Sequence, residues 1–274
     1  PPLMESDFGE IWKVTPDGHA TLVVSKDITP YGMLLGVAVR DDRVYVALYD
    51  QGAGTISPGV YRVDGRSLTQ VVTLPAGAMP NGLAFHDGRL YITDSVTGRI
   101  WRTRVDGPLA EPKMPWLQDA LLAPGGDGLG ANGLAFRGDD LFVSVSDSGR
   151  IVRIPTRREG MPGAPRVVCE RPELVSADGI AFDATGDLWI TANHGTKGAS
   201  PAGGLFRLSP RGALKTVADD PGWLNYPAML VFGTDRCTRD TLYVENGAYF
   251  SAYGDGSQPD IQALRVGVPG LPLR

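Results

Sequence analysis

The sequence predicts an all-β protein, a six-bladed β-propeller whose first blade is incomplete. Three observations support this prediction. A short glycine-led motif recurs along the chain, each copy is followed by further apolar strands, and glycine makes up 36 of the 274 residues, which is typical of a chain with many turns. A repeat of about 50 residues is a period found in propeller blades. We expect residues 1–274 to form one domain.

The repeated motif marks the inner strand of each blade. Its pattern is Gly-Leu/Ile-Ala-Phe in three copies and is weaker in two others, and successive copies begin 46, 51, 46 and 50 residues apart. The five copies occupy residues 36–39, 82–85, 133–136, 179–182 and 229–232. This near-constant spacing indicates one structural unit that is repeated five times.

Two further strands follow each copy of the motif. A charged or glycine turn leads into a second apolar strand, which predicts a hairpin, at residues 44–46, 90–92, 141–143, 188–190 and 242–244. A third strand alternates apolar and basic residues, at 60–63, 100–102, 151–154, 205–208 and 263–266. Most repeats add an edge-like segment such as residues 70–73 or 215–217, which completes a four-stranded blade.

The beginning of the chain matches only the outer half of a blade. Residues 11–14 and 20–24 have the patterns of the third and fourth strands. Five repeats and this half blade make six blades, with the first two strands of the leading blade absent from the sequence as given. The tail, residues 267–272, contains too much proline to replace them as central strands. We therefore expect an N-terminal segment to be missing.

Charge and hydropathy exclude two classes of partner. The net charge is −5 and the basic residues are dispersed, so the basic patch of a nucleic-acid-binding protein is missing. No stretch approaches the roughly 20 consecutive apolar residues that span a bilayer. We expect a small-molecule substrate and no nucleic-acid or membrane partner, while the compartment and the oligomeric state stay open. Cys169 and Cys237 are expected to be unpaired thiols, with a single disulfide as the alternative.

Polar residues precede three neighbouring inner strands. In a propeller the blades are related by rotation, so equivalent positions form a ring around the central tunnel. The residues directly before the five motif copies are Leu35, Asn81, Asn132, Asp178 and Ala228. Asn81, Asn132 and Asp178 are therefore expected to point at one place on the axis, although each is also a good turn residue, which is the alternative reason for its presence.

The chemistry of these three side chains predicts the type of metal. Amide and carboxylate oxygens suit a hard cation such as Ca²⁺, and the absence of a cluster of Cys or His argues against zinc or copper. We predict calcium at the axis, with another divalent cation as the alternative.

Glycine-led inner strands preceded by Asn, Asn and Asp make the chain resemble the SMP-30/gluconolactonase/LRE-like region family of calcium-dependent six-bladed propellers, over nearly its whole length. The resemblance implies that Asn132 and Asp178 are calcium ligands, that Asn81 contacts the metal or its waters and the substrate, and that Asp178 can also act as a base. The family's remaining ligand is a Glu before the first inner strand. That strand is missing here, so the fourth protein ligand is unassigned.

The loops that follow the second strands are expected to wall the same mouth of the tunnel. Asp94, Asn193 and Tyr249 lie at the ends of such strands or in these loops and are predicted to contact the substrate. His194 lies in the blade that supplies Asp178 and is a candidate proton shuttle. A loop histidine that only hydrogen-bonds its neighbours is the alternative.

These features favour a metal-dependent hydrolase of a lactone or related ester, in which calcium polarises the carbonyl and Asp178 or His194 activates water. Glu245, which ends the second strand of the last blade, is a third candidate catalytic group. It supports an alternative, a strictosidine synthase-like enzyme of secondary metabolism that uses an acid without calcium. An isomerase or cyclase with the same metal pocket and a non-catalytic NHL-type propeller that binds a ligand or protein are further alternatives, because a fold does not determine a function.

Overall fold

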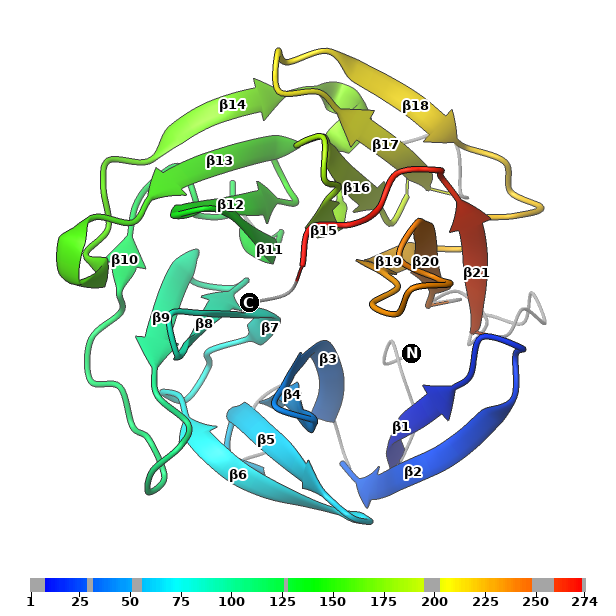
Figure 1. Ribbon diagram of the computed structural model, residues 1–274. Coiled ribbons are helices and arrows are strands. Elements are labelled where there is room, and N and C mark those ends of the chain that lie inside the picture. Colours follow the sequence, from blue (N-terminus) through cyan, green and yellow to red (C-terminus); the bar gives the residue numbers. More distant parts are fainter. Residues whose placement is uncertain are drawn as a thin grey trace.

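The computed structural model is an all-β propeller in which sheets radiate from a central axis (Figure 1). It describes residues 8–28, 32–50, 56–125, 128–194, 203–247 and 259–272. In every blade the strands are consecutive in sequence and pair antiparallel, with the first strand of the blade nearest the axis. The predicted order of strands within a blade is therefore confirmed.

Four blades have four strands each. The first comprises β3 (Gly32–Arg40), β4 (Arg43–Asp50), β5 (Gly59–Asp64) and β6 (Ser67–Thr73). The second comprises β7 (Pro80–His86), β8 (Arg89–Asp94), β9 (Arg99–Thr103) and β10 (Leu117–Gln118). The third comprises β11 (Ala131–Arg137), β12 (Asp140–Val145), β13 (Arg150–Pro155) and β14 (Arg166–Glu170). The fourth comprises β15 (Ala177–Phe182), β16 (Leu188–Ala192), β17 (Gly204–Leu208) and β18 (Leu214–Ala218).

The remaining sheets are smaller, and here the structure differs from the prediction. The last blade has three strands, β19 (Pro227–Phe232), β20 (Thr241–Asn246) and β21 (Asp260–Arg265). A separate sheet has only two, β1 (Phe8–Val14) and β2 (Ala20–Asp27). The described residues thus form five blades and a two-stranded sheet, so the six predicted blades are not shown. Two short 3-10 helices are η1 (Arg158–Gly160) and η2 (Pro172–Leu174).

The glycines of the motif are explained by the close approach of neighbouring inner strands. A Cβ atom on Gly82 would lie 2.5 Å from the carbonyl oxygen of Asn132, and one on Gly133 would come still closer to the carbonyl oxygen of Asp178. Any side chain would collide with this backbone. Glycine therefore sets how closely β7, β11 and β15 approach one another, and it places their preceding residues side by side around the axis.

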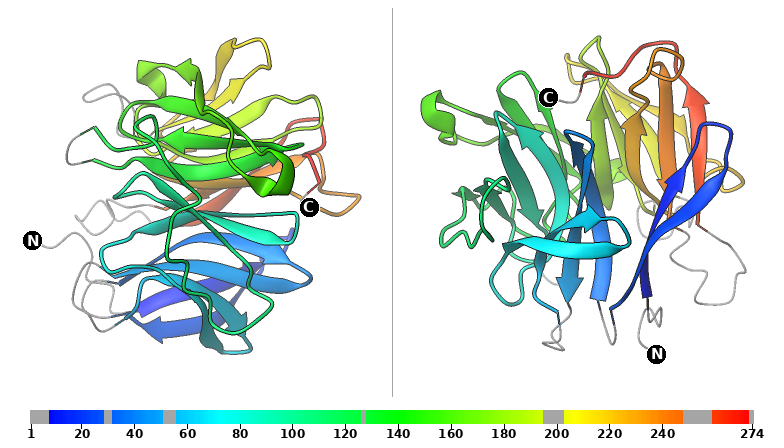
Figure 2. Two further views of the ribbon diagram at one scale, coloured as in Figure 1. Left: turned by 90° about the vertical axis from the view of Figure 1, so that its left-hand side faces the viewer. Right: turned by 60° about the horizontal axis from the view of Figure 1, so that its bottom comes forward.

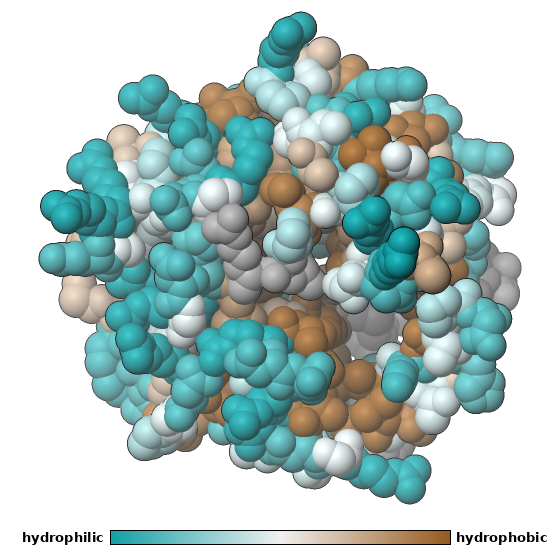
Figure 3. All heavy atoms as spheres, viewed as in Figure 1, coloured by the Kyte–Doolittle hydropathy of each residue, from teal (hydrophilic) through white to brown (hydrophobic). Residues whose placement is uncertain are grey.

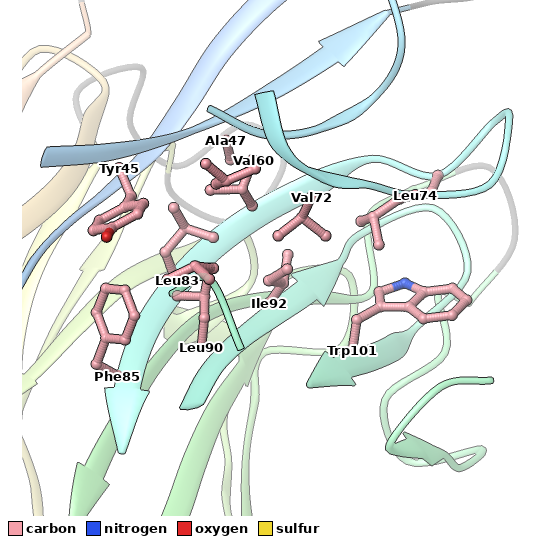
Figure 4. Packing of buried hydrophobic residues seen from close by; sticks show 13 residues of the cluster. Tyr45, Ala47, Val60, Val72, Leu74, Leu83, Phe85, Leu90, Ile92 and Trp101 are labelled. Carbon is pink, nitrogen blue, oxygen red and sulfur yellow. The ribbon is translucent and has the colours of Figure 1, made fainter. Parts of the chain in front are cut away.

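Aromatic contacts repeat between neighbouring blades. In each case an aromatic ring on the second strand of one blade meets, edge-on, the Phe that ends the motif of the next blade. The ring pairs, with their centroid separations, are Tyr45–Phe85 at 5.1 Å, Tyr91–Phe136 at 4.9 Å and Phe142–Phe182 at 4.8 Å. Figure 4 shows the first pair within the apolar core between the blades β3–β6 and β7–β10. The repeated motif thus builds the interface between blades as well as the inner strand.

The two-stranded sheet lies between the blade β3–β6 and the blade β19–β21 (Figures 1 and 2). Strand β1 approaches β3, and β2 approaches β6. Val37 and Val39 of β3 and Val231 of β19 are exposed, although they belong to inner strands. Figure 3 shows hydrophobic side chains around a hollow beside the axis. Among the described residues, β3 and β19 are thus less completely covered than the other inner strands.

The two cysteines lie in different surroundings. Cys169 is buried, Cys237 is exposed, and both thiols are free, as predicted. In the described part of the chain, no helix has the length and apolar character needed to cross a membrane.

Candidate functional site

The three polar residues predicted at the axis lie at equivalent positions of β7, β11 and β15. Asn81, Asn132 and Asp178 are each the second residue of their strand. At each of them the register with the second strand of the blade shifts, between residues 80 and 83, 131 and 134, and 177 and 180. A bulge of this kind leaves residues unpaired and re-aims their side chains. The structure therefore brings the three residues to one mouth of the tunnel, on strands whose backbones are in contact.

A polar residue directly after the second strand holds each of these axial side chains. Ser95, Ser146 and Asn193 occupy this position in three neighbouring blades. The bonds run from Asn81 Nδ2 to Ser95 Oγ (3.1 Å), from Asn132 Nδ2 to Ser146 Oγ (3.0 Å), and from Asn193 Nδ2 to Asp178 Oδ2 (2.9 Å). The side chains at the axis are thus positioned by their own blades.

Each holding residue also donates to the next blade. Ser95 Oγ donates to the carbonyl oxygen of Ala131 (2.8 Å), Ser146 Oγ to that of Ala177 (2.7 Å), and Asn193 Nδ2 to that of Pro227 (3.1 Å). A serine hydroxyl has one hydrogen to donate, and in Ser95 and Ser146 it is donated to a carbonyl oxygen of the next blade. The serine oxygens must therefore accept hydrogen bonds from the amide NH₂ groups of Asn81 and Asn132, which determines how these amides are oriented.

The orientation of the Asn132 amide leaves its oxygen without a partner. Asn132 is only 2% exposed, and its Oδ1 accepts no hydrogen bond from the described residues. Buried polar atoms are nearly always satisfied in folded proteins, and an unsatisfied one calls for a ligand, an ion or a water. Asn132 Oδ1 is therefore an oxygen donor available to a cation at the axis.

Two carboxyl groups at this mouth have raised pKa values. Burial raises the pKa of Asp178 to about 7, the hydrogen bond from Asn193 opposes the shift, and the charge of Glu245 adds to it. Burial also raises the pKa of Glu245, against a hydrogen bond from the Met229 backbone. The protein groups alone disfavour two negative charges here. A bound cation would compensate these charges, and pKa values perturbed in this way are typical of functional sites.

His194 lies in the loop after β16, against the segment that leads to Asp178. Its backbone N–H donates to Ser176 Oγ (3.1 Å), and the same hydroxyl donates to the carbonyl oxygen of His194. The His194 ring lies 6.1 Å from that of Tyr226. Ser176 and Tyr226 have φ angles of 66° and 58°, a conformation that is costly for residues other than glycine and common at functional sites.

Asp94 has surroundings of a different kind. Its side chain is fully buried, and its carboxylate accepts hydrogen bonds from the backbone of Met79 (3.1 Å) and Thr97 (3.2 Å) and from the indole of Trp101 (3.3 Å). These three bonds hold the turn after β8 in place. Asp94 therefore supports the mouth of the tunnel through the backbone.

Asn193, Ser95 and Ser146 show what sequence-based reasoning missed. The contact observed for Asn193 is the bond that positions Asp178, and the two serines have the same role for Asn81 and Asn132. The signal is present in the sequence, because all three follow the second strand of their blade directly. Tyr249 lies outside the described residues.

No family model matches the chain, and neither does any curated protein. Among solved structures, it is similar to a chain of a nidogen/laminin complex, with a TM-score of 0.60 and 17% identity, over 94% of this chain and 86% of the other. It is also similar to a gluconolactonase from Xanthomonas campestris, with a TM-score of 0.55 and 21% identity, over 87% of this chain and 76% of the other. At these identities the similarity shows the fold alone, a β-propeller.

Proposed function

We propose that this protein is a calcium-dependent hydrolase that opens a lactone or a related ester, and that it is a divergent member of the SMP-30/gluconolactonase/LRE-like region family. The observation that carries the proposal is the unsatisfied, buried Oδ1 of Asn132, which lies on the strand next to the one that carries Asp178. The similarity to a gluconolactonase structure supports the proposal through the fold.

The donor set at the axis fits calcium. Asn81 and Asn132 have committed their NH₂ groups to serines, so that amide oxygens are left for a ligand, and Asp178 adds a carboxylate. Oxygen donors of these two kinds are those that Ca²⁺ prefers. Calcium held there would supply a Lewis acid for the carbonyl oxygen of the substrate.

The remaining chemistry belongs to side chains of this chain. A carboxyl group with a pKa of about 7, as at Asp178, is suited to take a proton from water near neutral pH. The bond from Asn193 holds Oδ2 of that carboxyl in one orientation. His194 at the same mouth is the second candidate base, and Asn81, which is only partly buried, is the candidate substrate contact.

Hydrolysis of a panel of lactones tests this function. We expect activity that chelation with EGTA abolishes and added Ca²⁺ restores. Asp178→Asn should lower kcat/KM by about 10²-fold or more. Asp219→Asn is the matched control, because Asp219 is exposed and away from the axis. Undiminished activity of Asp178→Asn, or activity that persists in EGTA, would contradict the proposal.

A second candidate is a calcium-independent enzyme that uses Glu245 as an acid. The raised pKa of Glu245 favours it, because burial lets this group retain a proton at higher pH than an exposed Glu. It predicts an activity that EGTA leaves unchanged and that Glu245→Gln abolishes. Isomerisation or cyclisation in the same pocket would appear as a product that retains the mass of the substrate, whereas hydrolysis adds one water.

We also propose that β1 and β2 occupy the place of a sixth blade. The sheet lies between the blades β3–β6 and β19–β21, and its strands have the pattern of the outer strands of a blade. The exposed valines of β3 lie on an inner strand whose equivalents are covered by a neighbouring blade. Hydrogen exchange in β1 and β2 tests this arrangement.

A further inference from the structure

A group of three side chains of types that can ligate a metal, His86, Asp87 and Asp139, lies at the other end of the inner strands. His86 ends β7, the strand that carries Asn81 at its beginning, and Asp87 follows it in the turn to β8. Asp139 lies in the turn between β11 and β12 of the next blade. This group is therefore separated from the candidate active site by the length of the strands.

The three ligand atoms converge on one point. His86 Nε2 lies 3.4 Å from Asp139 Oδ1 and 3.6 Å from Asp87 Oδ2, and all three atoms lie within 4.8 Å of one another. The carboxylates belong to side chains that are 80% and 86% exposed, so an ion can enter from solvent.

The imidazole of His86 is buried, and its Nε2 atom has no hydrogen-bond partner among the described residues. The His86 side chain is 4% exposed, and Nε2 makes no hydrogen bond to any described residue, although two carboxylates are close to it. Buried polar atoms in folded proteins nearly always have a hydrogen-bond partner, so one without a partner calls for a ligand, an ion or a water. An unpartnered imidazole nitrogen close to two carboxylates forms a set of ligands that can bind a metal ion.

The surrounding structure holds the three ligands in place. The His86 ring is stacked on Phe136, with centroids 4.1 Å apart and an angle of 7° between the planes. Asp87 and the glycine after it form a two-residue turn with φ angles of 46° and 67°, as in a tight hairpin. The carbonyl oxygen of Asp139 accepts hydrogen bonds from both the backbone N–H and the hydroxyl of Thr156.

The neighbouring blades show what a purely structural residue looks like at this position. Arg40 and Arg137 are the equivalents of His86, and each guanidinium lies over the Phe of the next blade, 4.7 Å from the ring of Phe85 and 5.0 Å from that of Phe182. Stacking on the next blade is therefore the shared role. Among these three residues, only His86 adds a nitrogen that can bind a metal.

We propose that His86, Asp87 and Asp139 bind a divalent transition-metal ion, and that Zn²⁺ is the ion that fits. Zinc ligands of this kind lie at about 2.0–2.2 Å from the ion, so two ligand atoms of a tetrahedral site are roughly 3.4 Å apart. The observed separations from Nε2 match this value. The imidazole nitrogen distinguishes this site from the all-oxygen site at the axis. Three protein ligands leave the fourth position to water.

Competition with a chromophoric zinc chelator tests the proposal on the metal-free protein. We expect wild type to bind one zinc ion at this site, and Asp139→Asn to bind it about tenfold or more weakly. Asp139 is exposed, so this change leaves the core intact. Asp42→Asn is the control, because Asp42 is an exposed residue of the equivalent turn between β3 and β4 and should leave zinc affinity unchanged.

His86→Arg is the second variant, because it installs the residue that the neighbouring blades use for stacking. It should fold with a Tm close to that of metal-free wild type, and zinc should raise the Tm of wild type only. Equal zinc affinity in wild type and either variant would overturn the proposal. So would loss of zinc binding in Asp178→Asn, since the ion would then lie at the axis.

Discussion

At the scale of single residues, two buried polar side chains at the same mouth of the tunnel differ in how well they are satisfied. The carboxylate of Asp94 accepts three hydrogen bonds, whereas Oδ1 of Asn132 accepts none from the described residues. Each unsatisfied buried acceptor lowers stability by about 1–3 kcal/mol. The free Oδ1 of Asn132 therefore suits it to bind a ligand, whereas the three bonds to Asp94 show that its carboxylate holds a turn in place.

The pKa of Asp178 predicts how the stability of the metal-free protein depends on pH. This pKa is about 7 in the folded protein and close to 3.8 in the unfolded chain. Between these values the folded state binds a proton that the unfolded state has released, so the free energy of unfolding falls as pH rises from about 4 to 7. Glu245, with its raised pKa, adds a fall of the same sign.

Urea denaturation in EDTA at pH 5 and pH 8 measures this effect. Asp178→Asn should reduce the loss of stability between the two pH values, and Asp219→Asn should retain the loss seen in wild type. Calcium should reduce the loss in wild type, because it stabilises the ionised form of Asp178. An identical loss in wild type and Asp178→Asn would contradict the assignment.

Gly133→Ala tests the close approach of the inner strands. The new methyl group would collide with the backbone of Asp178, so we expect a destabilisation of about 1–3 kcal/mol in chemical denaturation. Gly107→Ala is the control, because nothing lies within 4 Å of a Cβ there, and it should change stability by less than about 0.5 kcal/mol. Equal stability of the two variants would show that β11 and β15 have room to separate.

At the scale of elements, the second strand of three blades is hydrogen-bonded to the inner strand of the next blade near the axis. Thr93 of β8, Ser144 of β12 and Thr191 of β16 occupy the same position in their strands. Their hydroxyls donate to the carbonyl oxygens of Asn132, Asp178 and Ala228 respectively. These bonds fix the backbones on which the candidate metal ligands stand.

Thr93→Val tests this link with almost no change of shape. The hydroxyl also accepts the N–H of Gly82 (2.8 Å), so its loss leaves buried groups unsatisfied and should cost about 1–3 kcal/mol. Thr216→Val in β18 is the control, since Thr216 is exposed and should tolerate valine. Thermal or urea unfolding compares the two variants, and a Thr93→Val protein as stable as the control would rule out the link.

At the scale of the whole molecule, the inner strands contact one another in order from β3 to β19. The two-stranded sheet stands on the remaining side of this ring. An isolated two-stranded hairpin is marginal in water, so β1 and β2 are stable only if they pack on the neighbouring blades. Protection of their amides against hydrogen exchange would therefore show whether β1 and β2 are packed in the place of a sixth blade.

Hydrogen exchange should rank three parts of the molecule. We expect amides of β11–β14, a blade with a blade on either side, to exchange slowest. Those of β19–β21 should exchange about tenfold faster or more, which corresponds to about 1.4 kcal/mol in local stability. The paired amides of β1 and β2 should be slower than those of an unstructured peptide. Exchange in β1 and β2 as fast as in an unstructured peptide would contradict the proposal that these strands occupy the place of a sixth blade.

Much of the candidate site follows from the sequence alone, for a reason of symmetry. The motif at residues 82–85, 133–136 and 179–182 has a blade-like period, and rotation about an axis turns equal positions in the repeat into neighbouring positions in space. The predicted strands and the equivalent positions of Asn81, Asn132 and Asp178 near the starts of β7, β11 and β15 follow from that rule, whereas the close approach at the glycines is seen only in the structure.

Only the tertiary structure decided how many blades the described chain completes, because a sheet is completed by pairing over long distances and the repeat does not encode it. It also decided which polar atoms are hydrogen-bonded. Two serines accept hydrogen bonds from the amides of Asn81 and Asn132, and the carboxylate of Asp94 accepts three hydrogen bonds. The meeting of His86 with Asp139 likewise has no pattern in the sequence, because it joins turns of two different blades. Side-chain contacts between blades depend on exact separations in space, and periodicity determines only positions along the chain.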